Sequence, residues 1–187
     1  YQKNNPEDLE SAVDFLKGGG AGLEDLPQPV VQRTRDLLET IRRGSIYDRN
    51  GRLLAGERLA EGVGGVGEEA PEGDGIVRFY NEPSLAHVIG YVSGMGTGVS
   101  GLELSYNETL LGLDRVDSQF DQLLHRTITG SDLILTIDSP TQRAAERALE
   151  GKSGAIVVMD AHSGAVLAMA STPRFDPNRI LEAGYAT

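Results

Sequence analysis

Hydrophobic side chains recur at helical spacing in two segments near the start of the chain. Pro6 and the acids after it suit the first turn of a helix, and the glycines from residue 18 onward end this pattern. The second stripe predicts a helix over residues 29–42, with Arg42 and Arg43 at its negative end, where cations are favoured. The two stripes consist of Leu9, Ala12, Val13, Leu16, Val30, Thr34, Leu37, Leu38 and Ile41.

Turn residues separate the next short apolar runs. Asn50-Gly51 stands between residues 44–48 and residues 53–55, and this dipeptide between apolar runs predicts a β-hairpin. Residues 56–75 differ, because they hold seven glycines, six acids and a single base. Such a segment buries too little apolar surface to offset the entropy of ordering it, so we expect a mobile surface loop.

Strands and helices follow one another over the rest of the chain. The pattern predicts strands at residues 76–80, 133–137, 155–159 and 165–170, and helical segments at residues 84–90, at residues 102–111 between Ser100 and Gly112, and from Ser139 onward. Ser139, Pro140 and Gln142 form a helix-capping pattern, and the alanines after them give that helix a small-residue face. The last two strands are apolar at almost every position, which favours a sheet covered on both faces. These elements predict an α+β fold.

Composition narrows the classes of partner and site. The net charge of −11 and the isoelectric point near 4.7 disfavour nucleic acid as a partner. Cysteine is absent, which excludes disulfides and thiolate metal sites. The sequence has neither an apolar run of membrane-spanning length nor a signal-peptide pattern, and it begins at Tyr1, so a membrane anchor further upstream stays open.

The candidate reactive motifs are weak when they are read in context. Acyl transfer to an active-site serine can use the motif set Ser-x-x-Lys, Ser-x-Asn and Lys-Thr/Ser-Gly, and none of the serines here has a lysine three positions on. Ser105-Tyr106-Asn107 and Lys152-Ser153-Gly154 match the two shorter patterns by chance. Residues 62–67 fit Gly-x-Gly-x-x-Gly but stand in the acidic loop rather than between a strand and a helix. The histidines lack metal-ligand spacing, so we predict no catalytic residue, cofactor or metal site.

Four blocks of residues nevertheless occur in a specific order. The first runs from Arg43 to Ala55, and the second joins residues 87–92 with Gly101-Leu102-Glu103 and Tyr106-Asn107. The later blocks comprise Leu135-Thr136-Ile137-Asp138, Gln142, Ala145-Glu146, Gly154-Ala155, Asp160, Ser163-Gly164, Leu167-Ala168-Met169, Ser171-Thr172-Pro173 and Phe175-Asp176-Pro177-Asn178. Over roughly residues 42–179 the sequence resembles the class B penicillin-binding proteins.

Positions within these blocks are expected to support the fold rather than to react. They are Arg43, Gly44, Asp48, Arg49, Gly51, Gly101, Glu103, Asp138, Asp160 and Gly164. If Arg43 and Arg49 flank the hairpin and face Glu103, a partly buried, bidentate pair would clamp the N-terminal segment onto the later helix. The alternative is that these are solvated surface charges, each pair worth about 0–1 kcal/mol.

The resemblance also implies an organisation of the chain. Residues 1–129 would form a pedestal of helices and short antiparallel strands, and residues 130–187 would begin the transpeptidase domain with an incomplete antiparallel sheet and a packed helix. The chain would stop before the catalytic serine motif. We expect the open edge of the last hairpin to recruit a second copy in a strand-swapped dimer, or a separate C-terminal fragment.

The function that the resemblance implies belongs to a longer parent protein. That parent would be a serine-acylating D,D-transpeptidase that cross-links peptidoglycan stem peptides and is acylated by β-lactams. An upstream helix would anchor it to the extracytoplasmic face of a bacterial membrane, where the present segment would position the catalytic domain and contact a membrane polysaccharide polymerase. Two alternatives remain, a non-enzymatic binding or sensor protein and an assembly module for cell division that uses the same pedestal.

Overall fold

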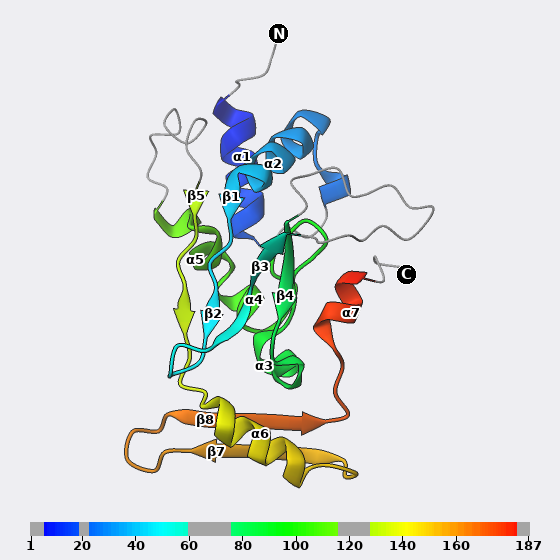
Figure 1. Cartoon of the computed structure of the whole chain (residues 1–187). Coiled ribbons are helices and arrows are strands. Elements are labelled where there is room, and N and C mark those ends of the chain that lie inside the picture. The colour runs from blue at the N-terminus through cyan, green and yellow to red at the C-terminus, as the bar shows by residue number, and fades with distance from the viewer. Residues whose placement is uncertain (1–5, 19–22, 60–75, 116–127, 183–187) are drawn as a thin grey trace.

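Two helices pack against each other at one end of the molecule (Figure 1). The structure, a computed structural model, describes residues 6–18, 23–59, 76–115 and 128–182. Helix α1 spans Pro6–Lys17, a 3-10 turn η1 spans Leu23–Asp25, and helix α2 spans Gln28–Thr40. Their predicted apolar stripes meet in a core that also includes Leu111 and Leu113, and each buried aliphatic side chain there contributes about 1.5–3 kcal/mol.

The predicted end of the second helix is wrong by two residues. Ile41–Arg42 form strand β1, which pairs in parallel with β5 (Ile128–Thr129). Ile41 is extended, with φ −85° and ψ 134°, and its side chain is buried in the helical core. Pairing with a distant strand therefore overrides the local helical pattern, and it directs the chain after Arg42 into the interior.

A four-stranded sheet forms the centre of the molecule, in the order β4-β3-β2-β6. Strands β2 (Ile46–Tyr47), β3 (Leu53–Leu59) and β4 (Ile76–Tyr80) are antiparallel, whereas β6 (Leu133–Ile134) runs parallel to β2. The predicted hairpin is confirmed. The strand predicted over residues 133–137 is shorter than expected, because only its first two residues pair.

The first four residues of the predicted acidic loop form part of a strand instead. Residues 56–59 continue strand β3, with Glu57 opposite Arg78 and Arg58 opposite Val77. Backbone pairing with β4 stabilises this polar end of the strand, which the hydrophobic pattern alone did not indicate. Residues 60–75 lie outside the described residues.

Short helices cover the central sheet. The helical turns predicted at residues 84–90 are confirmed as η2 (Pro83–Leu85) and α3 (Ala86–Ile89). The single helix predicted over residues 102–111 is wrong, because α4 (Gly101–Ser105) and α5 (Asn107–Leu111) are separated at Tyr106, and a 3-10 turn η3 (Leu113–Arg115) follows. The Ser100 side chain accepts no capping hydrogen bond, and the Tyr106 side chain at the break is 47% exposed. The break places Asn107 in the interior, where it is 2% exposed.

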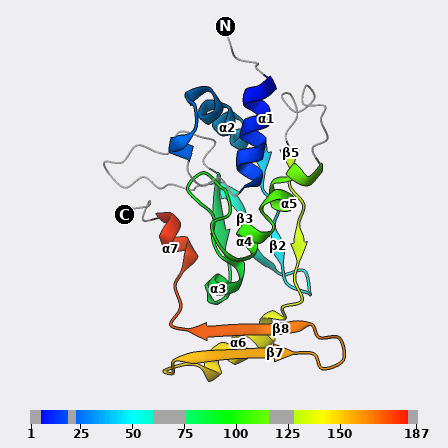
Figure 2. The ribbon, with the colours of Figure 1, turned by 180° about the vertical axis from the view of Figure 1, so that it is seen from behind.

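The C-terminal segment adds a second layer beneath the central sheet. Helix α6 (Ser139–Ala148) lies across one face of the antiparallel hairpin of β7 (Gly154–Met159) and β8 (Val166–Thr172), as Figures 1 and 2 show from opposite sides. Ala145 and Leu149 pack there against Ala168 and Ala170. From this layer the chain returns to the central sheet through α7 (Pro177–Glu182).

Two details of this layer differ from expectation. The cap of α6 is Asp138 rather than Ser139, since its carboxylate accepts from the Thr141 backbone N–H at 3.1 Å. Among the described residues only α6 covers the hairpin, and Val157 and Met159 on the opposite face are 53% and 56% exposed. The expectation of a sheet covered on both faces therefore fails for this part of the chain, because one helix can cover one face only. The α+β class itself is confirmed.

Candidate functional site

A carboxylate holds two arginines at the centre of the first lobe, which comprises the described elements from α1 to β6. Glu103 is fully buried, and its two oxygens accept from Arg43 Nε and Arg78 Nε, each at 2.8 Å. The arginine side chains are 2% and 3% exposed. The cluster therefore joins the segment after β1, strand β4 and helix α4, which lie far apart in the sequence.

Arg43 satisfies the rest of its guanidinium with fixed acceptors. Its Nη2 donates to the Glu103 carbonyl at 2.8 Å, and its Nη1 donates to Asn107 Oδ1 at 2.9 Å and to the Gly96 carbonyl at 3.2 Å. The Asn107 amide donates in turn to the Leu16 carbonyl at 2.7 Å, near the end of α1. The same network thus ties α1 to the sheet.

The electrostatics of the cluster make it costly to disturb. Burial lowers the pKa of Arg43 below its usual value, and the charge of Glu103 partly opposes that shift. A guanidinium nevertheless stays protonated in proteins, so Glu103 carries the charge that both cations require. Removing one partner from a buried ion pair costs about 3–5 kcal/mol, although the intact pair adds little net stability. The cluster therefore specifies the register of the three segments.

The sequence prediction identified two of the three members of this cluster. Arg43 contacts Glu103 as expected, although only one nitrogen of the guanidinium reaches the carboxylate. Arg49 is an exposed residue of the hairpin turn and is not part of the cluster, which corrects the predicted clamp. The missed member is Arg78, whose signal was its position in an apolar strand, on the same face as Tyr80. An arginine on the inward face of a strand needs a buried acceptor.

A second buried joint connects the hairpin turn to the C-terminal layer. Asp48 is 1% exposed, and its carboxylate accepts from the Ser139 hydroxyl at 2.6 Å and from the Arg52 backbone N–H at 2.9 Å. Burial raises the pKa of Asp48, but these hydrogen bonds outweigh burial and leave the pKa below its usual value. Beside this joint, the Asn50 amide donates to Asp138, the cap of α6, at 3.0 Å. The turn therefore fixes the first residues of α6.

Aromatic and amide contacts make a third connection between the two layers. Phe175 packs edge-on against His87 at 5.1 Å and against Tyr91 at 6.1 Å between ring centroids. The Asn178 side chain accepts from the Tyr80 backbone N–H at 2.9 Å and donates to its carbonyl at 3.0 Å. The Asn178 side chain therefore pairs with the backbone of Tyr80, at the end of β4, as a residue of a neighbouring strand would.

The remaining predicted positions lie at turns and close contacts. A Cβ on Gly44 would lie 2.0 Å from the Ser131 carbonyl oxygen, and one on Gly101 would lie 2.5 Å from the Val88 carbonyl oxygen, so both positions exclude a side chain. Gly51 closes the hairpin turn and Gly164 closes the β7–β8 turn, both with positive φ. Asp160 accepts from the backbone and hydroxyl of Ser163 in the latter turn, and these bonds lower its pKa.

The two short motif matches do not form a site for acyl transfer. Ser105 and Lys152 are both exposed, and the Lys152 ammonium donates to the Ala148 carbonyl at 2.9 Å. Across the described ranges no cluster of acids and histidines could hold a metal ion. None of the helices in those ranges is both long and apolar enough to span a bilayer. Residues 62–67 and His125 lie outside the described residues.

Comparison with known proteins identifies relatives of this chain. No protein-family model matches the chain. Over 114 residues it is 37% identical to the probable peptidoglycan D,D-transpeptidase PenA of Neisseria gonorrhoeae, covering 51% of this chain and 20% of PenA. Over 130 residues it is 34% identical to the peptidoglycan D,D-transpeptidase MrdA of Acinetobacter baumannii, covering 55% of this chain and 19% of MrdA. The chain therefore spans about one fifth of the length of these relatives.

The fold agrees with the sequence comparison. A crystal structure of penicillin-binding protein 3 from Mycobacterium tuberculosis, complexed with aztreonam, superposes with a TM-score of 0.58 at 31% identity, covering 78% of this chain and 31% of that one. The predicted resemblance to the class B penicillin-binding proteins is thus confirmed in both sequence and fold, for the part of such a protein to which this chain corresponds.

Proposed function

We propose that this chain is the non-catalytic front part of a peptidoglycan D,D-transpeptidase and that it holds the catalytic domain in position. The observation that carries this proposal is the Asp48–Ser139 bond, which is buried and connects the hairpin turn of the first lobe to helix α6. A buried, charge-assisted hydrogen bond fixes both position and orientation. The Glu103 cluster links three segments of the first lobe, so we expect that lobe to move as one body with the hairpin turn.

The proposed division places a pedestal at residues 1–129 and the beginning of the transpeptidase domain at residues 130–187. Strand β6 follows this boundary and pairs with β2 of the pedestal. The two parts would therefore share a sheet instead of being joined by a free linker, which supports a fixed orientation between them. The exposed face and edges of the β7–β8 hairpin would be completed by a C-terminal part of the protein or by a strand-swapped second copy.

The parent protein would carry the chemistry. The names of the relatives support D,D-transpeptidation of peptidoglycan, and the aztreonam complex of penicillin-binding protein 3 supports binding of a β-lactam. The 187 residues contain no Ser-x-x-Lys, so the reactive serine would lie in another part of the protein. In this proposal an upstream helix anchors the protein at the extracytoplasmic face of the membrane, and the pedestal contacts a membrane polysaccharide polymerase.

Labelling with a fluorescent penicillin tests the division of labour. We expect the 187-residue chain to remain unlabelled and the whole gene product to be labelled. In the whole protein, Asp48→Asn should slow peptidoglycan cross-linking while penicillin acylation continues, because the joint positions the domain but does not react. Asp114→Asn, at an exposed acid in η3, is the matched control. A labelled 187-residue chain, or equal cross-linking by the two variants, would contradict the proposal.

A further inference from the structure

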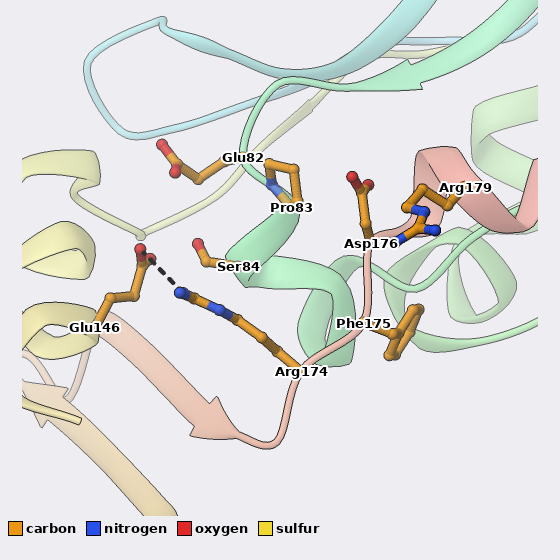
Figure 3. Close-up of a pocket in the computed structure, with 8 residues that line it drawn as sticks. All are labelled: Glu82, Pro83, Ser84, Glu146, Arg174, Phe175, Asp176 and Arg179. Atoms are coloured by element: carbon orange, nitrogen blue, oxygen red, sulfur yellow. Dashed lines mark ion pairs between the residues drawn. The ribbon is translucent and has the colours of Figure 1, made fainter. Parts of the chain in front are cut away.

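A pocket of about 430 Å³ opens where the first lobe meets the C-terminal layer. Figure 3 shows its lining, which comes from the segment around η2, from helix α6, from the chain between β8 and α7 and from α7 itself. Carboxylates, a hydroxyl and arginines line this pocket. None of these groups takes part in the Glu103 cluster or in the Asp48 joint.

Two polar atoms in this pocket are buried without a partner. Ser84 is 8% exposed, and its hydroxyl has no hydrogen-bond partner. Glu146 lines the same pocket, and its Oε1 is also buried and has no hydrogen-bond partner. Both groups point into the space between η2 and α6 in Figure 3, and no hydrogen bond joins them. Buried polar groups are nearly always paired. Glu146 Oε1 can only accept a hydrogen bond, and the Ser84 hydroxyl can accept one as well as donate, so a donor that reaches both atoms would satisfy this pocket.

The charges around these atoms point to a cationic donor. Burial raises the pKa of Glu82 above its usual value. The nearby carboxylate of Glu146 is the next largest cause of that rise. Arg143 Nη1 reaches only Oε2 of Glu82, at 3.3 Å, and Arg174 Nη1 reaches only Oε2 of Glu146, at 3.7 Å. The Arg174 side chain is 52% exposed, so its hold on Glu146 is loose.

We propose that this pocket binds the primary ammonium group of a small organic ligand. Such a group has three N–H donors on a compact charge, which matches the Ser84 hydroxyl and the carboxylates of Glu82 and Glu146. A metal ion is the poorer fit, because no group of acids and histidines among the described residues could hold one. This site uses no residue of the proposed positioning function, so each proposal can fail without the other.

The test is a titration of the 187-residue chain with n-propylammonium, followed by amide chemical shifts in NMR spectra. We expect saturable shifts that centre on Ser84 and Glu146. Tetramethylammonium carries the same charge without N–H donors, and it should give no saturable shift at these residues. Equal binding of both cations, or no saturable shift with n-propylammonium, would overturn the proposal.

Variants separate the site from general charge effects. Glu146→Gln should weaken n-propylammonium binding by about ten-fold or more, since it removes a charged acceptor. Glu150→Gln removes the same charge from an exposed position just beyond α6, and it should leave binding unchanged. Ser84→Ala should weaken binding roughly three-fold. Because this substitution deletes an unpaired hydroxyl, the folded chain should be at least as stable as wild type, which keeps the test valid if Glu146→Gln does not fold. Unchanged binding in Ser84→Ala, or an equal loss in Glu150→Gln, would refute the site.

Discussion

Replacing Glu103 by glutamine should be among the most destabilising single changes in this chain. The substitution keeps the shape of the side chain but removes the charge that Arg43 and Arg78 share. The new amide nitrogen would face one of the two Nε donors, and two buried cations would lose their common carboxylate. Breaking a buried ion pair in this way costs about 3–5 kcal/mol. That is a large fraction of the roughly 5–15 kcal/mol by which a domain is stable.

Urea unfolding followed by circular dichroism measures this effect as the change in the free energy of unfolding. The matched control is Glu108→Gln on α5, an exposed acid a few residues further on, which should change that free energy by no more than about 0.5 kcal/mol. Combining Glu103→Gln with Arg43→Met should be less damaging than the sum of the two, with a coupling of about 0.5–3 kcal/mol. If Glu103→Gln costs no more than its control, the cluster does not hold the lobe together.

The remaining predictions concern the joints and close contacts. The pKa of Asp48 is lowered in the folded chain, so the ionised carboxylate stabilises the fold above about pH 4. This stabilisation is lost as the pH falls through the pKa that Asp48 has in the folded chain. The free energy of unfolding, measured with urea between about pH 3 and 6, should therefore depend less on pH in Asp48→Asn than in wild type. Gly44→Ala should lower the free energy of unfolding by about 1–3 kcal/mol or more, because the new Cβ would meet the Ser131 carbonyl. Gly56→Ala, whose new Cβ would have its closest contact at 3.4 Å, should lower it less in the same assay. Asn178→Ala should cost about 1–3 kcal/mol and speed amide hydrogen exchange at Tyr80, because it unpairs both backbone groups of that residue; an unchanged exchange rate at Tyr80 would contradict the role of Asn178 as a strand substitute.

Local signals predicted most of the elements correctly. Pro6 and the glycines after Lys17 bound α1, and Asn50-Gly51 lies in the turn between β2 and β3. The errors cluster where distant partners decide the conformation. Ile41 leaves the helix because it pairs with Ile128, and residues 56–59 extend β3 because β4 lies beside them. Neither partner is close in sequence, so no local window contains the reason.

What the sequence determined by itself is the set of elements and the family resemblance, because periodicity, turn residues and ordered motifs are properties of short stretches. Only the tertiary structure decided which buried charges meet. Glu103 was expected to face two arginines, but Arg78 takes the place predicted for Arg49, since strand pairing turns Arg78 inward and the hairpin turn leaves Arg49 in solvent. The same holds for Ser139, which was predicted as a cap and serves as the partner of Asp48. A buried charge is stabilised by whichever partner the packing brings within hydrogen-bond distance, and that distance is a property of the folded chain.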